Sequence, residues 1–177
     1  ERVAVGGFSA GGLMALWLAT HDDLAKPGSD DPVARQSTRV VCAAVCDAPT
    51  NLHAAEVYGW FDVKTLVEFP STKKCFDIKS IEESDDPRVV GLARESSPIH
   101  HVSRDDAPVY MSYRRPMLTV SEWTGPFTWV HHPMFGVKMQ ETLKAAGIEC
   151  ALHYRGSTPP KKYADGVDFV AQKLGVK

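Results

Sequence analysis

Residues 3–17, VAVGGFSAGGLMALW, decide the fold of this chain. A short β-branched run ends abruptly in glycine, and an apolar, helix-forming run begins directly after the serine. Gly7 and Gly11 flank Ser9 at two residues on either side, a spacing expected where any Cβ atom would collide with the neighbouring strand or helix. The pattern predicts that Ser9 lies on a sharp strand-to-helix turn at the carboxyl edge of a parallel sheet, in a strained backbone conformation.

Ser9 is the candidate nucleophile of this stretch, because such a turn thrusts a hydroxyl out of the sheet. The first N–H groups of the following helix, above all that of Ala10, would then point at the space in which an oxyanion could form. A tight strand-to-helix connection with an incidental serine is the alternative. The strand before the motif and the apolar helix after it favour the nucleophile.

The composition is that of a globular domain with a core of ordinary size: 177 residues, of which 44% are apolar, with a net charge of −2. This charge gives no reason to expect nucleic acid or an anionic membrane as a partner, and no apolar run reaches the roughly 18 residues of a membrane span. We expect no metal ion and no cofactor. The chain begins at Glu1 inside a predicted strand and without an initiator methionine, so we expect a segment upstream of it, and no compartment is predicted.

The four cysteines show neither a C-x-x-C pair nor the spacing of a zinc site. Cys42 and Cys46 lie four residues apart in an apolar run, so both face the same side and are expected to be buried thiols. A bridge between Cys46 and Cys75 is the alternative, and it requires an oxidising compartment.

Hydrophobic patterns predict four strands that alternate with helices. The expected strands cover 2–5, 39–46, 108–113 and 149–154, and the expected helices cover 10–21, 86–97, 133–147 and 163–174. The helix at 10–21 is apolar almost all round, which predicts that it is buried. The fold class is therefore α/β with a doubly wound, mostly parallel sheet, of which four strands make only about half.

Residues 50–97 form a long excursion between the second and third strands, and its part at 50–86 has no clean period. Its aromatic residues stand among charges: Tyr58, Trp60, Phe61, Phe69 and Phe76. An aromatic-bearing excursion of this length is often a lid or a binding insertion, and a plain packing excursion is the equal alternative. The polar residues at 100–106 are expected to form a solvated turn.

Three passages resemble the C-terminal half of an α/β-hydrolase of the carboxylesterase and carbohydrate-esterase kind, such as the acetyl or feruloyl esterase-like proteins. They are 7–12 (GFSAGG), 97–109 (SPIHHVSRDDAPV) and 143–149 (LKAAGIE), and together they span nearly the whole chain. The resemblance implies that residues 1–177 are the C-terminal part of one α/β-hydrolase domain, with 50–97 as an insertion inside it. The four strands would be strands five to eight of that family's sheet, and the missing N-terminal half of the same domain would supply the others.

The resemblance also implies a function, that of a serine-nucleophile carboxylic ester hydrolase of acetyl-esterase type. Its substrate would be a small-molecule or carbohydrate-linked ester. Ser-Ala-Gly-Gly at 9–12 favours esterases over the related prolyl peptidases, which more often carry a tyrosine after the serine. The N-terminal half would carry a His-Gly-Gly loop with a second oxyanion N–H, so that Ala10 is the one donor expected within this chain.

The chain departs from the family's pattern at the position of the acid. Beyond the strand at 108–113, where the family places a carboxylate, it reads Arg114-Arg115-Pro116-Met117. The nearest acid is Glu122, in what looks like an inserted loop. Asp47, at the end of the second strand, is an alternative acid.

The family's base is also absent from its position near residues 155–160, and no histidine follows His153. His131 and His132 are the candidate substitutes, because they open the helix after the third strand at the same edge of the sheet as Ser9. If one of them acts as the base, its ring nitrogen should lie within hydrogen-bond reach of Ser9 Oγ. Polarity at the start of a helix is the plainer alternative for the pair.

The incomplete acid and base leave two other functions open. One is a catalytically degenerate binding protein, or pseudoenzyme, on the hydrolase scaffold, since a serine hydroxyl without a base is a poor nucleophile. The other is a serine peptidase of the prolyl oligopeptidase type. We also expect the chain alone not to be a competent enzyme, because its strand at 2–5 would keep one unpaired edge and the loss of one oxyanion donor costs roughly a hundredfold to a thousandfold in rate.

Overall fold

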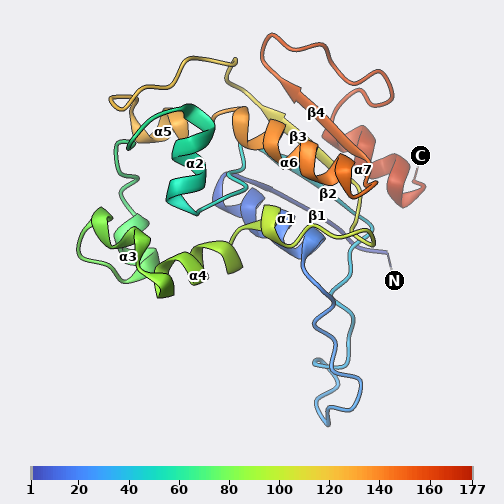
Figure 1. The fold of residues 1–177 in the computed structure, drawn as a ribbon. Coiled ribbons are helices and arrows are strands. Elements are labelled where there is room, and N and C mark those ends of the chain that lie inside the picture. Colours follow the sequence, from blue (N-terminus) through green and yellow to red (C-terminus); the bar gives the residue numbers. More distant parts are fainter. Residues whose placement is uncertain (1, 177) are drawn as a thin grey trace.

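The computed structural model describes residues 2–176, which form one sheet of four parallel strands (Figure 1). The strands are β1 (Ala4–Phe8), β2 (Cys42–Cys46), β3 (Val109–Tyr113) and β4 (Cys150–Tyr154). Their spatial order is β1-β2-β3-β4, so each strand pairs with the next one in the chain. The predicted α/β class and the alternation of strands with helices are confirmed.

The register of the strands brings their carboxyl ends to one edge of the sheet. Phe8 pairs with Cys46, and Cys46 pairs with Ser112. Because the strands are parallel and end in step, the residues that directly follow them, such as Ser9 and Asp47, lie side by side at this edge.

Helices cover both faces of the sheet, which is the doubly wound arrangement (Figure 1). α1 (Ala10–Thr20) and α6 (Met134–Ala145) pack on one face, and α7 (Gly166–Leu174) packs on the other. The fully buried apolar residues of α6 recur every four residues, as expected for a helix with one face on the core: Phe135, Met139 and Leu143. Across residues 2–176, none of the helices has the length and apolar character needed to cross a membrane.

The prediction that the first helix is buried all round is wrong. Leu16 faces the sheet and is fully buried, whereas Met14 is 66% and Leu18 37% exposed. A helix that lies on a sheet keeps one side uncovered unless another layer packs on it. α7 is one-sided too, because Phe169 is fully buried in the core whereas Val167 is largely exposed.

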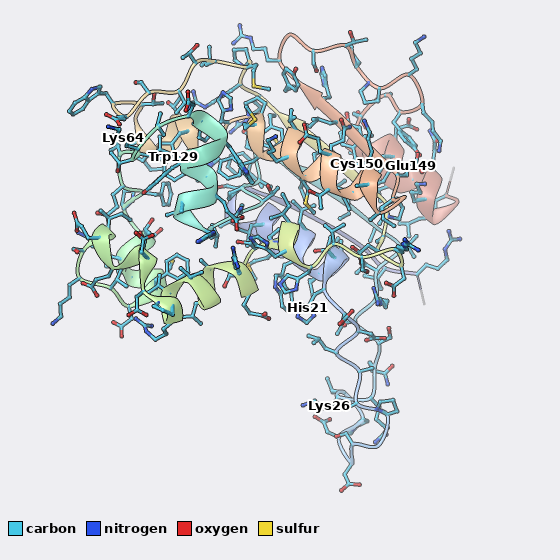
Figure 2. All side chains as sticks on the ribbon, in the orientation of Figure 1. His21, Lys26, Lys64, Trp129, Glu149 and Cys150 are labelled. Atoms are coloured by element: carbon cyan, nitrogen blue, oxygen red, sulfur yellow. The ribbon has the colours of Figure 1, made fainter. Side chains whose placement is uncertain are left out.

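Glu149, directly before β4, ties the C-terminal segment to the sheet (Figure 2). Its carboxylate accepts hydrogen bonds from Lys162 Nζ at 2.7 Å, Tyr163 Oη at 2.6 Å and Lys173 Nζ at 2.5 Å. Burial alone would raise the pKa of Glu149, but these donors together lower it to about 2. The carboxylate is therefore charged at neutral pH and holds the C-terminal end of α7 to the residue before β4.

The excursion at 50–97 is largely helical. It contains α2 (Ala54–Phe61), α3 (Thr72–Phe76), the 3-10 helix η1 (Ile81–Asp85) and α4 (Pro87–Glu95), and the 3-10 helix η2 (Pro98–His100) follows it. A small core of its own holds it together, built from Phe76, Ile78, Val89 and Ala93. Its role as a lid stays a prediction.

The four cysteines are free thiols in the described part of the chain. Cys42 and Cys150 are buried, Cys46 is half-buried and Cys75 is exposed. Burial raises the pKa of Cys150 to about 12, so this thiol is protonated and unreactive at neutral pH. The alternative bridge between Cys46 and Cys75 is not formed.

Close packing at the start of α1 explains which glycines the strand-to-helix turn requires. A Cβ on Gly7 would lie 2.3 Å from the backbone of Gly11, and a Cβ on Gly12 would lie 2.8 Å from the Cβ of Ala48. A Cβ on Gly11 meets nothing within 4 Å in the described chain, so the expectation that Gly11 is sterically required is wrong. The second required glycine is Gly12, where α1 crosses the residues after β2.

This difference predicts opposite effects for two neighbouring substitutions. Gly12→Ala should lower the free energy of unfolding by about 1 to 3 kcal/mol, because the new methyl group overpacks the contact with Ala48. Gly11→Ala should leave it unchanged or raise it by up to about 1 kcal/mol, because alanine favours a helix and has room there. Urea unfolding followed by circular dichroism measures both values, and equal values for the two variants would contradict the packing described.

Candidate functional site

Ser9 lies directly between β1 and α1, at the carboxyl edge of the sheet, as predicted. Its φ is 53° and its ψ is −120°, a backbone conformation that side chains other than glycine rarely adopt. The Ser9 N–H donates to the carbonyl of Cys46 at 3.0 Å, and the Ser9 carbonyl accepts from the N–H of Leu13 at 3.0 Å. The strained turn is thus anchored to the neighbouring strand on one side and to the first turn of the helix on the other.

His131 is the histidine beside Ser9. It follows α5 (Pro126–Trp129), and its Nε2 lies 2.8 Å from Ser9 Oγ. Its Nδ1 lies 2.9 Å from the backbone carbonyl of Phe127, which can only accept a hydrogen bond. Nδ1 therefore carries the proton, and the lone pair of Nε2 faces the serine hydroxyl. This is the tautomer that can take a proton from Ser9.

Phe8 and Arg114 lie around this histidine. The rings of Phe8 and His131 stack with centroids 5.8 Å apart. The guanidinium of Arg114 lies 4.6 Å from the centroid of the Phe8 ring, within the range of a cation–π contact. Phe8 thus contacts both the candidate base, His131, and Arg114, which stands where the resemblance places the acid.

Asp47 pairs with Arg114 and not with a histidine. Its side chain is buried and accepts hydrogen bonds from the backbone N–H of Arg114 at 2.8 Å and from Nε of Arg114 at 2.6 Å. These bonds and the charge of Asp47 raise the pKa of Arg114. Asp47 therefore neutralises a cation at this edge, and its place as an alternative acid is not supported by a contact with His131.

The candidate His132 points away from Ser9 into the core. Its side chain is fully buried, its Nδ1 accepts from the N–H of Met134 at 3.1 Å, and its Nε2 lies 2.9 Å from the carbonyl of Leu118. Burial lowers its pKa, so the ring is neutral. Because neighbouring residues at this bend point in opposite directions, His132 is a structural residue and the prediction of a catalytic His132 is wrong.

The candidate acid Glu122 does not reach His131 either. Its Oε1 accepts a hydrogen bond from the backbone N–H of Lys64 at 3.3 Å, which joins the loop after β3 to the excursion. The Nδ1 of His131, where an acid would be needed, faces the carbonyl of Phe127 instead. No sequence signal could have indicated this acceptor, because every residue has a backbone carbonyl.

Ala10 is the first residue of α1, so its N–H is one of the four at the helix start without a partner inside the helix. These N–H groups carry the positive end of the helix dipole. Of the remaining motif residues, Gly7 is required by its contact with Gly11, as described above.

A small apolar cavity of about 90 Å³ lies next to the histidine segment. Trp129 and Val130, which directly precede His131, form part of its wall, and the excursion supplies most of the rest, including Val57, Leu66 and Phe76. The indole N–H of Trp129 donates to the carbonyl of Val67 at 2.8 Å and so joins α5 to the excursion.

Comparison with known proteins gives a likeness of structure alone. No family model and no curated protein matches the sequence. An acetyl ester-xyloside bifunctional hydrolase from Caldicellulosiruptor lactoaceticus matches 98% of this chain with 24% identity and a TM-score of 0.60. A truncated carbohydrate esterase from gut microbiota matches 87% with 16% identity and a TM-score of 0.57, and a bifunctional GH43-CE protein from Bacteroides eggerthii matches 98% with 14% identity and a TM-score of 0.61.

The matches cover 51%, 50% and 24% of those three chains, so this chain spans about half their length or less. An esterase from Thermogutta terrifontis matches over 97% of this chain with a TM-score of 0.51. The likeness shows that the chain has the fold of esterases of the α/β-hydrolase type.

The burial of His132 predicts a pH dependence of stability. In the unfolded chain its pKa is about 6.5, and burial lowers it in the folded chain. Between these two pKa values the unfolded chain binds more protons, so the free energy of unfolding falls as the pH drops below about 6.5. His132→Gln should lower the free energy of unfolding at pH 7. Between pH 6.5 and 5 it should also make that free energy less dependent on pH, by up to about 1.4 kcal/mol per pH unit.

Urea unfolding of both proteins from pH 8 to pH 5 measures this difference. The two curves should run parallel above pH 7, which serves as the internal control. Parallel curves over the whole range would mean that His132 has the same pKa in the folded and the unfolded chain, and would contradict the effect of its burial.

Proposed function

We propose that this chain, which has the fold of α/β-hydrolase-type esterases, carries the nucleophile and the base of a serine carboxylic ester hydrolase. Ser9 is the nucleophile, on the nucleophile elbow of the G-x-S-x-G motif, and His131 is the base. The observation that carries the proposal is the 2.8 Å contact between Ser9 Oγ and His131 Nε2 beside the strained backbone of Ser9. A serine that only caps a helix has no need of either feature.

In the proposed reaction, Ser9 Oγ attacks the ester carbonyl carbon while His131 Nε2 takes the hydroxyl proton. The carbonyl oxygen becomes an oxyanion, which the N–H of Ala10 at the start of α1 stabilises. His131 then returns its proton to the departing alcohol, which leaves an acyl group on Ser9. Water, activated by the same nitrogen, releases the acid and restores the serine.

The Phe127 carbonyl takes the place that a carboxylate occupies in a complete triad. As a fixed acceptor at 2.9 Å it holds His131 in the tautomer with a free Nε2. A carbonyl dipole stabilises the imidazolium that forms during the reaction less than a full negative charge does. We therefore expect a lower kcat than that of an enzyme with a complete triad. The loss should be smaller than the factor of about 10⁴ in kcat that results when the histidine is held in the wrong tautomer.

The proposed partner is the N-terminal half of the same domain. β1 is an edge strand in the described chain and presents one unpaired side beside Val3 and Val5. The chain also spans about half the length of the similar esterases. That half would pair with β1 and add a second oxyanion donor, so residues 1–177 alone should hydrolyse esters slowly.

The proposed substrate is a small acyl ester, such as an acetyl group, on a small alcohol or a carbohydrate. The apolar cavity that Trp129 and Val130 help to line is small, at about 90 Å³, which suits a short acyl chain, although Ser9 and His131 are not part of its wall. Two of the similar structures are named for acetyl ester or carbohydrate ester hydrolysis, and the likeness to them over 98% and 87% of this chain supports the same class of substrate.

A degenerate hydrolase that binds without catalysis is the second candidate. This candidate is favoured because Arg114, which pairs with Asp47, stands where the resemblance places the catalytic carboxylate. Covalent chemistry at Ser9 distinguishes the two, because a binding protein does not need a reactive serine.

The proposed roles predict selective labelling by a fluorophosphonate, which reacts only with an activated serine. Mass spectrometry should show one adduct on Ser9 of the native chain and none on Ser9→Ala. His131→Ala should slow labelling and p-nitrophenyl acetate hydrolysis by roughly a thousandfold or more, because the hydroxyl loses its base.

Ser112→Ala is the matched control, because Ser112 lies at the same edge of the sheet but donates its hydroxyl to the carbonyl of Val45. It should be labelled like the native chain. A native chain that stays unlabelled, even when joined to an upstream half, would favour the binding protein.

The geometry also predicts the effect of removing the candidate acid. Glu122→Gln should change the labelling rate less than about twofold, because its carboxylate contacts the N–H of Lys64 and not His131. A fall of a hundredfold or more would show that Glu122 acts on the histidine in the reacting protein.

A further inference from the structure

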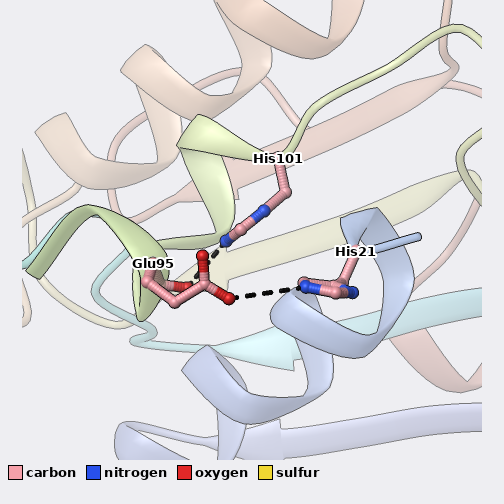
Figure 3. Close-up of side chains that lie close together, drawn as sticks. All are labelled: His21, Glu95 and His101. Carbon is pink, nitrogen blue, oxygen red and sulfur yellow. Dashed lines mark hydrogen bonds and ion pairs between the residues drawn. The ribbon is translucent and has the colours of Figure 1, made fainter. Parts of the chain in front are cut away.

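Three potential metal ligands meet at the C-terminal end of α1, far from Ser9. They are His21, Glu95 and His101, which come from the end of α1, the last residue of α4 and the segment after η2 (Figure 3). At a rise of about 1.5 Å per residue, the helix separates this cluster from Ser9 by about 18 Å. The cluster therefore lies outside the proposed active site.

The three side chains converge closely. One ring nitrogen of each histidine and one carboxylate oxygen of Glu95 all lie within 4.8 Å of one another. His21 Nε2 and Glu95 Oε1 are 3.6 Å apart. With metal–ligand bonds of about 2.0 to 2.2 Å, neighbouring ligand atoms of a tetrahedral zinc ion lie roughly 3.3 to 3.5 Å apart. The pair thus already has nearly the separation that a shared cation requires.

Surrounding contacts orient His21 as a ligand. Its Nδ1 lies 3.0 Å from the carbonyl of Asp22, so Nδ1 donates and the lone pair of Nε2 faces Glu95. Metal-binding histidines almost always donate their other N–H in this way. The ring of Trp17 stacks on His21 with centroids 4.0 Å apart and holds it in place.

The same support extends to the other two ligands. Trp17 Nε1 donates to the carbonyl of Glu95 at 2.8 Å, and His101 Nε2 lies 2.7 Å from the same oxygen. Within the segment at 100–106, expected to be a solvated turn, His101 packs at the edge of the Trp17 ring, whereas His100, Arg104 and Asp105 are exposed. The side chain of Glu95 is 63% exposed, so it can rotate the small distance that closes the site.

We propose that His21, Glu95 and His101 bind one zinc ion, with a fourth position left for water. Two imidazoles and one carboxylate suit zinc, whereas calcium and magnesium prefer oxygen ligands. His21 is the C-cap of α1, and the negative end of the helix dipole favours a cation at this place. The bound ion joins α1 to α4 and to the segment before β3, and so stabilises the fold without taking part in ester hydrolysis.

No sequence motif indicates the site, because Glu95 lies 74 residues after His21 and His101 lies 6 residues after Glu95. The sequence therefore predicted no metal. Only the packing of the end of α4 and of the η2 segment against α1 brings Glu95 and His101 to His21.

Zinc binding to the tag-free chain, stripped with a chelator, tests the proposal. Titration with zinc chloride against a chromophoric chelator should give one ion per chain. Cobalt should give the visible absorption bands of a four-coordinate site. Mutation of a residue that only orients a metal ligand weakens metal binding roughly 10- to 100-fold. Because His21→Gln and Glu95→Gln each remove a ligand itself, each should weaken zinc binding by more than that.

Two controls exclude other ligands. Cys75→Ser removes the exposed thiol and His153→Gln removes a half-buried histidine of β4, and both should bind zinc like the native chain. Zinc should raise the unfolding temperature of the native chain and of the controls but not that of Glu95→Gln, which changes an exposed side chain and so retains the fold. Labelling of Ser9 should be unaffected in every variant.

The absence of stoichiometric zinc binding by the native chain would overturn the proposal. So would binding that persists unchanged in His21→Gln and Glu95→Gln, since the ion would then lie elsewhere. Neither result would bear on the proposed ester hydrolysis.

Discussion

The rest of the structure depends on the close approach of β1 to the first turn of α1. A side chain at Gly7 would lie 2.3 Å from the backbone of Gly11, so the strand can pass directly into the helix only because glycine stands there. Ser9 absorbs the change of direction with a positive φ, and the bond from its N–H to the carbonyl of Cys46 fastens the turn to β2. This one contact sets the position of the hydroxyl, the direction of α1 and the packing of Gly12 on the residues after β2.

The ion pair between Asp47 and Arg114 determines the charge distribution at the carboxyl edge of the sheet. Asp47 is buried, and a buried carboxylate is costly unless it is paired and hydrogen-bonded. Arg114, directly after β3, supplies both the charge and the hydrogen bonds. The arginine at the family's acid position therefore leaves His131 without a carboxylate, and a backbone carbonyl orients the ring instead. The carbonyl fixes the tautomer of the proposed base, but it lacks the full negative charge that would stabilise an imidazolium.

α1 links the two sites that we propose. Its N-terminus holds Ser9 and the free N–H of Ala10, where the helix dipole favours a developing negative charge. Its C-terminus holds His21, where the same dipole favours a cation. The two ends differ in structure: the first is a strained turn whose hydroxyl contacts His131, whereas at the second the ring of Trp17 stacks on His21.

The sequence by itself determined the local elements and the motif. The β-branched runs, the glycines around Ser9 and the four-residue spacing of Phe135, Met139 and Leu143 depend on contacts that are near in sequence or repeat with a fixed period, so these features could be predicted. Only the tertiary structure decided between His131 and His132, because the direction of a side chain at a bend depends on which ring the core has room for. It also decided that Gly12 and not Gly11 is packed, that a carbonyl replaces the expected acid, and that His21 meets Glu95 and His101. These contacts join segments far apart in the chain, and the packing that brings them together leaves no periodic trace in the sequence.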